Sequence, residues 1–251
     1  MRATEMTWQE YRDCIASSII FLPVGAMEQH GPHLPLSVDM ILPTKMSELA
    51  AEQVGGVVLP TIPYGYKSQP TSGGGQRFPG TTSLNGNTLI NVVLDILRET
   101  YRHGGRRFVV FNGHYENEMF LTEAIDLFIR GAPDARVMLL DETLLVSDEM
   151  LEELFVESGF PGWDVEHAAV IETSLMQYYA PELVREDEKV DGGLKRPLPY
   201  RMFPEPDDVV HESGVLYRAT LASREKGEKY VKHVLPKIVE VITRELANQG
   251  G

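Results

Sequence analysis

The sequence predicts an α/β fold in which a mostly parallel central sheet is covered by helices on both faces. Short apolar runs typical of buried strands alternate along the chain with segments whose apolar residues recur at helical spacing. The links between them are short, as in parallel sheets with helical crossovers. The 251 residues, 43% hydrophobic and 24% charged, have the composition of a soluble globular protein, and we expect one domain over residues 1–251.

The first half of the chain contains five predicted elements. Thr7 is a suitable N-cap for a short amphipathic helix, and the pair Gly55-Gly56 is a suitable helix end. In order, the elements are a helix over 7–15, a strand over 19–24, a helix over 41–54, a strand over 57–62 and a helix over 87–102.

The second half continues the alternation and then becomes irregular. A helix that contains Glu172 is expected after residue 167, and residues 191–220 are rich in proline and charge, which predicts an irregular segment. In order, the other elements are a strand over 107–111, a helix over 118–130, a strand over 136–140, a helix over 150–156 and a closing helix over 222–247.

Potential metal ligands follow the first predicted strand, which stops at Gly25. Glu28, His30 and Asp39 offer an imidazole and two carboxylates, which suit a divalent cation such as Zn²⁺ or Mn²⁺. Ligands in parallel sheets gather outside the carboxyl ends of the strands, so the position also suits a site. One catalytic ion needs about three protein ligands, and this stretch by itself does not decide between one ion and two.

A second cluster follows the strand over 107–111. His114 and Glu116 are two positions apart in an irregular turn, where residues i and i+2 project to the same side. The five ligands together suit two cations bridged by a carboxylate and a water better than one tetrahedral site. Each residue alone could instead be a helix cap or a buried, hydrogen-bonded histidine.

A third group lies in the segment Gly-Trp-Asp-Val-Glu-His at 162–167. Trp163, Asp164, Glu166 and His167 suggest an aromatic wall with a proton donor beside a substrate, and Glu172 lies in the helix that follows. The alternative is that Asp164 is only the N-cap of that helix, with His167 in its first turn.

The glycine-rich run at 72–75 does not have the pattern of a nucleotide-binding loop, because no strand immediately precedes it and no Gly-Lys-Ser/Thr follows. Its glycines would instead let backbone amides approach a small ligand closely. The site is therefore expected to bind a small molecule.

Charge and composition limit the possible partners. The net charge of −14 argues against binding to a nucleic-acid backbone, which requires a basic face. No apolar run approaches the roughly 20 residues of a membrane-spanning helix, and residues 1–6 carry no signal-peptide pattern. The single cysteine, Cys14, cannot form an intrachain disulfide, so we expect a cytoplasmic protein with neither nucleic acid nor membrane as a partner.

These motifs resemble the creatininase family, and the resemblance covers nearly the whole chain. Its residues include Leu-Pro-Val-Gly-Ala-Met-Glu-Gln-His-Gly at 22–31, Asn-Gly-His-Tyr-Glu-Asn at 112–117 and Gly-Trp-Asp-Val-Glu-His at 162–167. Tyr-Gly-Tyr-Lys-Ser-Gln at 64–69, Ser-Gly-Gly-Gly at 72–75 and Ala-Ser-Arg-Glu-Lys-Gly at 222–227 also match, and these are closer to creatininase itself than to the wider superfamily.

The resemblance implies a three-layer α/β/α sandwich, a homohexamer and a site for two divalent ions, Zn²⁺ and Mn²⁺. In that family pattern Asp39 bridges the ions, Glu28 and His114 complete one ion site, and His30 and Glu116 complete the other. The implied reaction is hydrolysis of creatinine to creatine by a metal-bridging water.

The resemblance also implies roles for the residues around the ions. His167 protonates the departing ring nitrogen, with Glu166 and Glu172 orienting it and the water, and Glu116 is also expected among the catalytic residues. The residues that match substrate-holding positions of the family are Ser72, Tyr115, Trp163, Asp164 and His167.

The chain departs from the family where a second tryptophan closes over the substrate. Residues 141–145 read Asp-Glu-Thr-Leu-Leu, and the only tryptophans are Trp8 and Trp163. Weaker stacking would favour another small amide, as in the formamidopyrimidine deformylases and the redox-peptide peptidase of the same superfamily. A further alternative is a non-catalytic metal-binding protein on the same fold.

Overall fold

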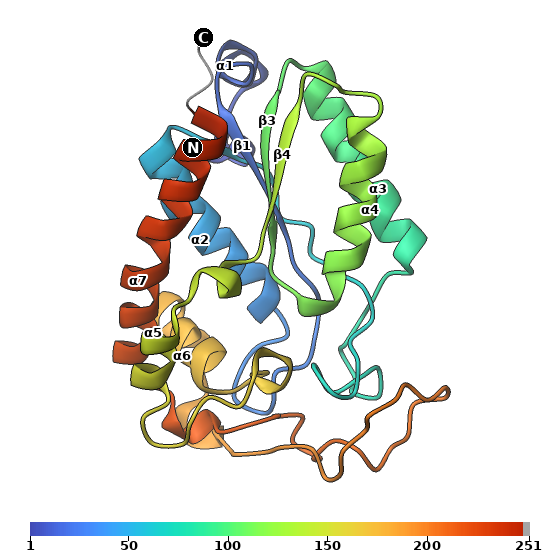
Figure 1. Ribbon diagram of the computed structural model, residues 1–251, viewed down its shortest axis with the longest axis vertical. Coiled ribbons are helices and arrows are strands. Elements are labelled where there is room, and N and C mark those ends of the chain that lie inside the picture. Colours follow the sequence, from blue (N-terminus) through green and yellow to red (C-terminus); the bar gives the residue numbers. More distant parts are fainter. Residues whose placement is uncertain (248–251) are drawn as a thin grey trace.

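The computed structural model describes residues 1–247, in which four parallel strands form a central sheet (Figure 1). The strands are β1 (Ile19–Val24), β2 (Val57–Val58), β3 (Arg107–Asn112) and β4 (Arg136–Leu140), in the order β2-β1-β3-β4. All three pairings are parallel, as predicted. Because the chain leaves β1 toward β2 and later returns to β3 on the other side, the carboxyl ends of β1 and β3 form a topological switch point.

Helices cover both faces of the sheet, which gives the predicted three layers (Figure 1). One layer contains α2, α5, α6 and α7, and the other contains α3 and α4. The helices are α1 (Trp8–Cys14), α2 (Val38–Val54), α3 (Gly86–Arg102), α4 (Glu118–Ile129), α5 (Asp148–Leu154), α6 (Val170–Tyr179) and α7 (Arg224–Ile242). A π-helical stretch, Thr243–Ala247, continues α7. The prediction of one domain over 1–251 reaches beyond the described residues and stays a prediction.

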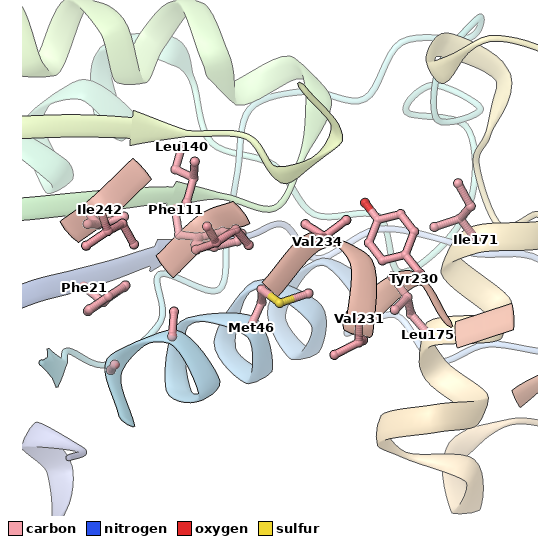
Figure 2. Packing of buried hydrophobic residues seen from close by; sticks show 14 of the residues in the cluster. Phe21, Met46, Phe111, Leu140, Ile171, Leu175, Tyr230, Val231, Val234 and Ile242 are labelled. Atoms are coloured by element: carbon pink, nitrogen blue, oxygen red, sulfur yellow. The ribbon is translucent and has the colours of Figure 1, made fainter. Parts of the chain in front are cut away.

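The core is split by the sheet because successive side chains of a strand point to opposite faces. Phe21 of β1 and Phe111 of β3 pack toward α2 and α7, where Figure 2 shows them near Ile242. Ile20 and Phe108 face α3 and α4. All four side chains are buried, which is why these strands read as continuous apolar runs in the sequence.

The predicted strand over 57–62 was wrong in its extent, since β2 covers only Val57–Val58. Pro60 has no N–H to donate and interrupts the ladder. Pairing with β1 resumes at Ile62, whose N–H donates to the carbonyl of Pro23 at 3.0 Å. The chain therefore still follows β1 to its carboxyl end.

One predicted helix cap is confirmed, and two helices begin earlier in the chain than predicted. Thr7 does cap α1, in a capping box with Glu10. The helix predicted over 150–156 begins at Asp148, because the Ser147 side chain accepts from the Met150 N–H. The helix predicted over 41–54 begins at Val38, which places Asp39 in the first turn of α2.

Residues 191–220 form an irregular segment, as predicted, that runs along one end of the molecule beneath the helices (Figure 1). Within residues 1–247, no helix has the length and apolar character that crossing a membrane would require.

Candidate metal centre

Asp39 is brought to the switch point by two glycines that follow the strands. A Cβ at Gly25 would lie 2.2 Å from the Asp39 carbonyl oxygen, and one at Gly113 would lie 2.7 Å from it. Pro43, one turn later, removes the N–H that would otherwise bond to this carbonyl. The first turn of α2 therefore fits between the ends of β1 and β3.

One group of ligand atoms contains Glu28, Asp39 and His114. His114 Nδ1 lies 3.1 Å from Glu28 Oε2 and 3.1 Å from Asp39 Oδ2, and all three side chains are buried. Its other nitrogen, Nε2, lies 3.1 Å from the Tyr66 carbonyl, which can only accept. When the ring is neutral, Nε2 therefore carries the proton, and Nδ1 presents a lone pair to two carboxylates.

A second group contains His30, Asp39 and Glu172. His30 Nε2 lies 3.1 Å from Asp39 Oδ1 and 3.5 Å from Glu172 Oε2. His30 Nδ1 lies 3.2 Å from the Glu28 carbonyl oxygen, so this nitrogen carries the proton. The lone pair on Nε2 therefore faces carboxylates as well, and Asp39 belongs to both groups.

The donor set fits divalent cations. Buried polar atoms are normally hydrogen-bonded, yet Glu28 Oε1, His30 Nε2 and Asp39 Oδ2 have no hydrogen-bond partner among the described residues. Ligands about 2.1 Å from a shared tetrahedral ion would lie roughly 3.4 Å apart, close to the separations seen here. Lone pairs directed at carboxylates repel, and a cation between them removes that repulsion.

Electrostatics point the same way. Burial raises the pKa of Glu28 to about 7, against the opposing effect of His114. Burial lowers the pKa of His114 and of His30, but the surrounding carboxylates outweigh it and hold both pKa values well above the usual range. A site whose buried groups need protons to balance their charges is a site that a cation can stabilise.

Glu116 takes a different place from the one that the family pattern implies. Its Oε2 lies 3.2 Å from His114 Nε2, and its Oε1 accepts from the Gln69 N–H at 2.9 Å and from the Ser72 hydroxyl at 2.5 Å. The structure brings Glu172, not Glu116, to His30. The ligand and catalytic roles of Glu116 stay predictions.

His167 lies beside this cluster, with its ring centroid 4.4 Å from that of His30. Its Nε2 is 2.9 Å from both the side-chain nitrogen and the backbone oxygen of Gln29. The Gln29 amide uses its two N–H groups on the carbonyls of Gly73 and Gly214. The Nε2–H group of His167 therefore donates to the backbone carbonyl of Gln29, and Nδ1 is the unprotonated nitrogen.

Burial, and then the charge of His30, lower the pKa of His167 to about 4. The ring is therefore neutral at pH 7. Glu166 is buried, which raises its pKa, and its Oε1 accepts from the Ile171 N–H at 2.8 Å at the start of α6. Glu172 Oε2 accepts from the Ala168 N–H at 2.5 Å, so both acids are tied to the turn that carries His167.

A cavity of about 130 Å³ opens over the cluster. Ser72, Tyr115, Trp163 and His167 line it, together with Glu116, Glu166 and Glu172. Asp164 is exposed and lines the neighbouring outer pocket instead, next to Ser72 and Tyr115. The alternative of Asp164 as an N-cap is wrong, because Ala169 precedes α6 and Asp164 lies in a separate 3₁₀ turn, Trp163–Val165.

Two residues that contact the site or line its cavity were not predicted from the sequence as site residues. Gln29 fixes the tautomer of His167, and Glu142 lines the cavity from the turn after β4. Gln29 lies between two predicted ligands, which was the available signal. Glu142 lies in the segment that replaces the family tryptophan, and nothing in its own sequence context shows that it faces the pocket.

His33 lies outside both ligand groups. It is buried with Nε2 2.9 Å from the Thr173 hydroxyl, and burial lowers its pKa to about 4. Because unfolded histidine binds protons below about pH 6.5, stability should fall as the pH drops from 6.5 toward 4. At pH 5 the loss from this group is about 2 kcal/mol.

We therefore expect His33→Gln to reduce the pH dependence of unfolding free energy between pH 7 and pH 5, measured by urea denaturation in EDTA. The matched control is His103→Gln, which replaces an exposed histidine. An unchanged pH dependence in His33→Gln would contradict the assignment of a buried neutral ring.

Comparison with known proteins agrees with this geometry. A family model described as "Creatininase: Creatinine amidohydrolase" matches residues 4–242. The creatinine amidohydrolase of Pseudomonas putida is 45% identical over 248 residues, covering 96% of this chain and 95% of the relative. A solved structure described as "Creatininase Mn" superimposes with a TM-score of 0.93 at 45% identity, over 97% of this chain and 98% of that one. A mutant creatininase of "Zn-Zn type" has a TM-score of 0.93 at 44% identity, over 97% of both chains.

Proposed function

The chain belongs to the creatininase family, and on that premise we propose that it hydrolyses the ring amide of creatinine to give creatine. The observation that carries the proposal is the shared Asp39, whose two oxygens each face a different histidine lone pair. A carboxylate between two three-ligand groups is what a pair of divalent cations requires.

The residues that would hold the ions are those of the two ligand groups, Glu28, Asp39 and His114 for one and His30, Asp39 and Glu172 for the other, with Glu116 as a further candidate. Bound Zn²⁺ or Mn²⁺ would supply Lewis-acid polarisation of the carbonyl and lower the pKa of water. Each histidine is held in the ligating tautomer by a backbone carbonyl, that of Tyr66 for His114 and that of Glu28 for His30.

His167 would move the proton. Its unprotonated Nδ1 accepts a proton as water adds to the amide carbonyl, and the same nitrogen then gives that proton to the departing ring nitrogen. The Gln29 carbonyl stabilises the imidazolium that exists between the two steps, since it already accepts from Nε2–H. The amide C–N bond breaks, and the hydroxyl group of the water stays on the carbonyl carbon. One proton of the water passes through His167 to the ring nitrogen, and the acid that forms gives its proton to the guanidine group, so the product is zwitterionic creatine.

The other proposed roles concern orientation. Glu166 and Glu172 anchor the turn that carries His167 through the N–H groups of Ile171 and Ala168. Trp163 packs against Phe160 with ring centroids 5.0 Å apart, which holds its indole as a fixed wall of the cavity. Ser72, Tyr115 and Asp164, which line the neighbouring outer pocket, are proposed to hold the substrate there.

We also propose a homohexamer, which the family pattern supports, and a cytoplasmic location. The lone Cys14 is a free thiol, which suits a reducing compartment. Hydrolysis of another small amide on the same site is the second candidate function, and the observation that favours it is the acidic turn Glu142–Leu145 where the family has a tryptophan.

The test is an assay of creatinine hydrolysis by the purified protein after removal of metal with EDTA and reconstitution with Mn²⁺ or Zn²⁺. We expect turnover only in the reconstituted samples, with two ions bound per chain by elemental analysis. Absence of turnover at millimolar creatinine with two ions bound would reject creatinine but leave another amide. Binding of no divalent ion would reject the metal site itself.

A further inference from the structure

The wall of the cavity nearest β4 is formed by the start of the turn Glu142–Leu145 (η3). Asp141 fixes this turn, because its Oδ1 accepts from the Thr143 N–H at 3.0 Å and from the Thr143 hydroxyl at 2.6 Å. Leu144 points outward and is 79% exposed. Asp141, Glu142 and Thr143 therefore face the cavity, and no residue of the turn covers it as a stacking aromatic would.

Glu142 has a carboxyl oxygen without a protein partner. Its Oε2 is buried and makes no hydrogen bond to any residue that the structure describes. Burial raises the pKa of Glu142 to about 8, Asp141 adds to this, and only Tyr230 of α7 opposes it. Figure 2 shows the Tyr230 ring between Val234 and Ile171, so the phenol lies at the edge of the apolar core. An unpartnered buried carboxyl costs stability unless a ligand pairs with it.

The charge of the cavity indicates which ligand would do so. Seven carboxyl side chains line it, and no lysine or arginine does among the described residues. The carboxylates of the ligand groups would be neutralised by bound cations, whereas Glu142, which follows β4 and lines the same cavity, belongs to none of these groups. The acidic pair Asp141 and Glu142 at this wall disfavours a carboxylate on the substrate and favours N–H donors.

Building on the proposed function, we propose that Glu142 is a specificity-determining residue that pairs with the amidine-like edge of creatinine through the exocyclic N–H. A carboxyl oxygen accepts this hydrogen bond whether the group is ionised or protonated. The departing ring nitrogen next to it is left to His167. Glu142 would thus supply by hydrogen bonding the recognition that an aromatic lid supplies by stacking.

The test compares Glu142→Gln with the parent protein on two substrates. Creatinine carries the amidine-like edge, and 1-methylhydantoin carries a carbonyl oxygen in place of the exocyclic nitrogen. We expect the ratio of kcat/KM values, creatinine over 1-methylhydantoin, to fall by about 10- to 100-fold, because the glutamine amide can donate to the carbonyl of the analogue. The control is Glu152→Gln, the same change at an exposed site of α5, which should leave the ratio unchanged.

A binding measurement separates this inference from the proposed function. Calorimetry with methylguanidine, on metal-loaded protein, is expected to show at least about tenfold weaker binding to Glu142→Gln than to the parent. If the parent does not hydrolyse creatinine but this loss is seen, the proposed function fails and the inference holds. An unchanged substrate ratio, or methylguanidine binding that does not depend on Glu142, would overturn the inference. If Glu142→Gln does not fold, Glu142→Asp, which withdraws the carboxyl by one methylene, replaces it in both measurements with the same expected direction.

Discussion

Asp39→Ala is expected to abolish turnover and to leave fewer than one divalent ion per chain. The Asp39 carboxylate is shared by the group with Glu28 and His114 and the group with His30 and Glu172. One of its oxygens lies 3.1 Å from His30 and the other 3.1 Å from His114. Its loss therefore weakens both sites at once. Metal-assisted stabilisation of the transition state is worth several kcal/mol, so kcat/KM should fall by roughly 10³- to 10⁵-fold.

Elemental analysis and the creatinine assay, run on the same preparation, measure this prediction. Asp95→Ala is the control, because it removes an exposed acid from α3 and should keep both ions and full activity. Circular dichroism checks that Asp39→Ala is folded, since removing one partner from a buried group of charges can destabilise the fold. Two retained ions with more than a tenth of the activity would eliminate the shared-ligand arrangement.

His167→Gln should lower kcat by about 10²- to 10⁴-fold while both ions stay bound, because it removes the group that moves the proton but leaves intact the two ligand groups that share Asp39. KM should change much less, since the walls of the cavity stay in place. The measurements are steady-state kinetics and metal content. His211→Gln, at an exposed position in the 191–220 segment, is the matched control and should behave like the parent.

Two results would count against this role. A variant with normal kcat would show that water or another acid moves the proton. A variant that loses its ions would show that His167 is a metal ligand. His167 also forms a candidate ligand group with Glu28 and His30.

The sheet was predictable because β1 and β3 are buried on both faces and so read as uninterrupted apolar runs. The extent of β2 was not, because the effect of Pro60 depends on whether its neighbours pair with β1. The start of α2 was missed for a related reason. Ser37 makes no side-chain cap bond, and the turn forms because Gly25 and Gly113 leave room for it.

The candidate ligands were predictable from residue type and from their position after strands. Which of the ligands lie next to one another was not predictable, because their arrangement depends on how α6 packs. Glu172 reaches His30 from the first turn of α6, whereas Glu116 turns toward Ser72 and the outer nitrogen of His114. The importance of Glu142 was hidden for the same reason, since only the folded turn directs its carboxyl inward.

The partnerless atoms of Glu28, His30 and Asp39 also affect the lifetime of the protein in the cell. Ions that bind only the folded chain stabilise it. Each tenfold rise in the free metal concentration above the dissociation constant adds about 1.4 kcal/mol to the free energy of unfolding per ion. When metal becomes scarce, the fraction of unfolded chains rises, and proteases remove unfolded chains. The abundance of this protein would then follow metal supply without any dedicated sensor.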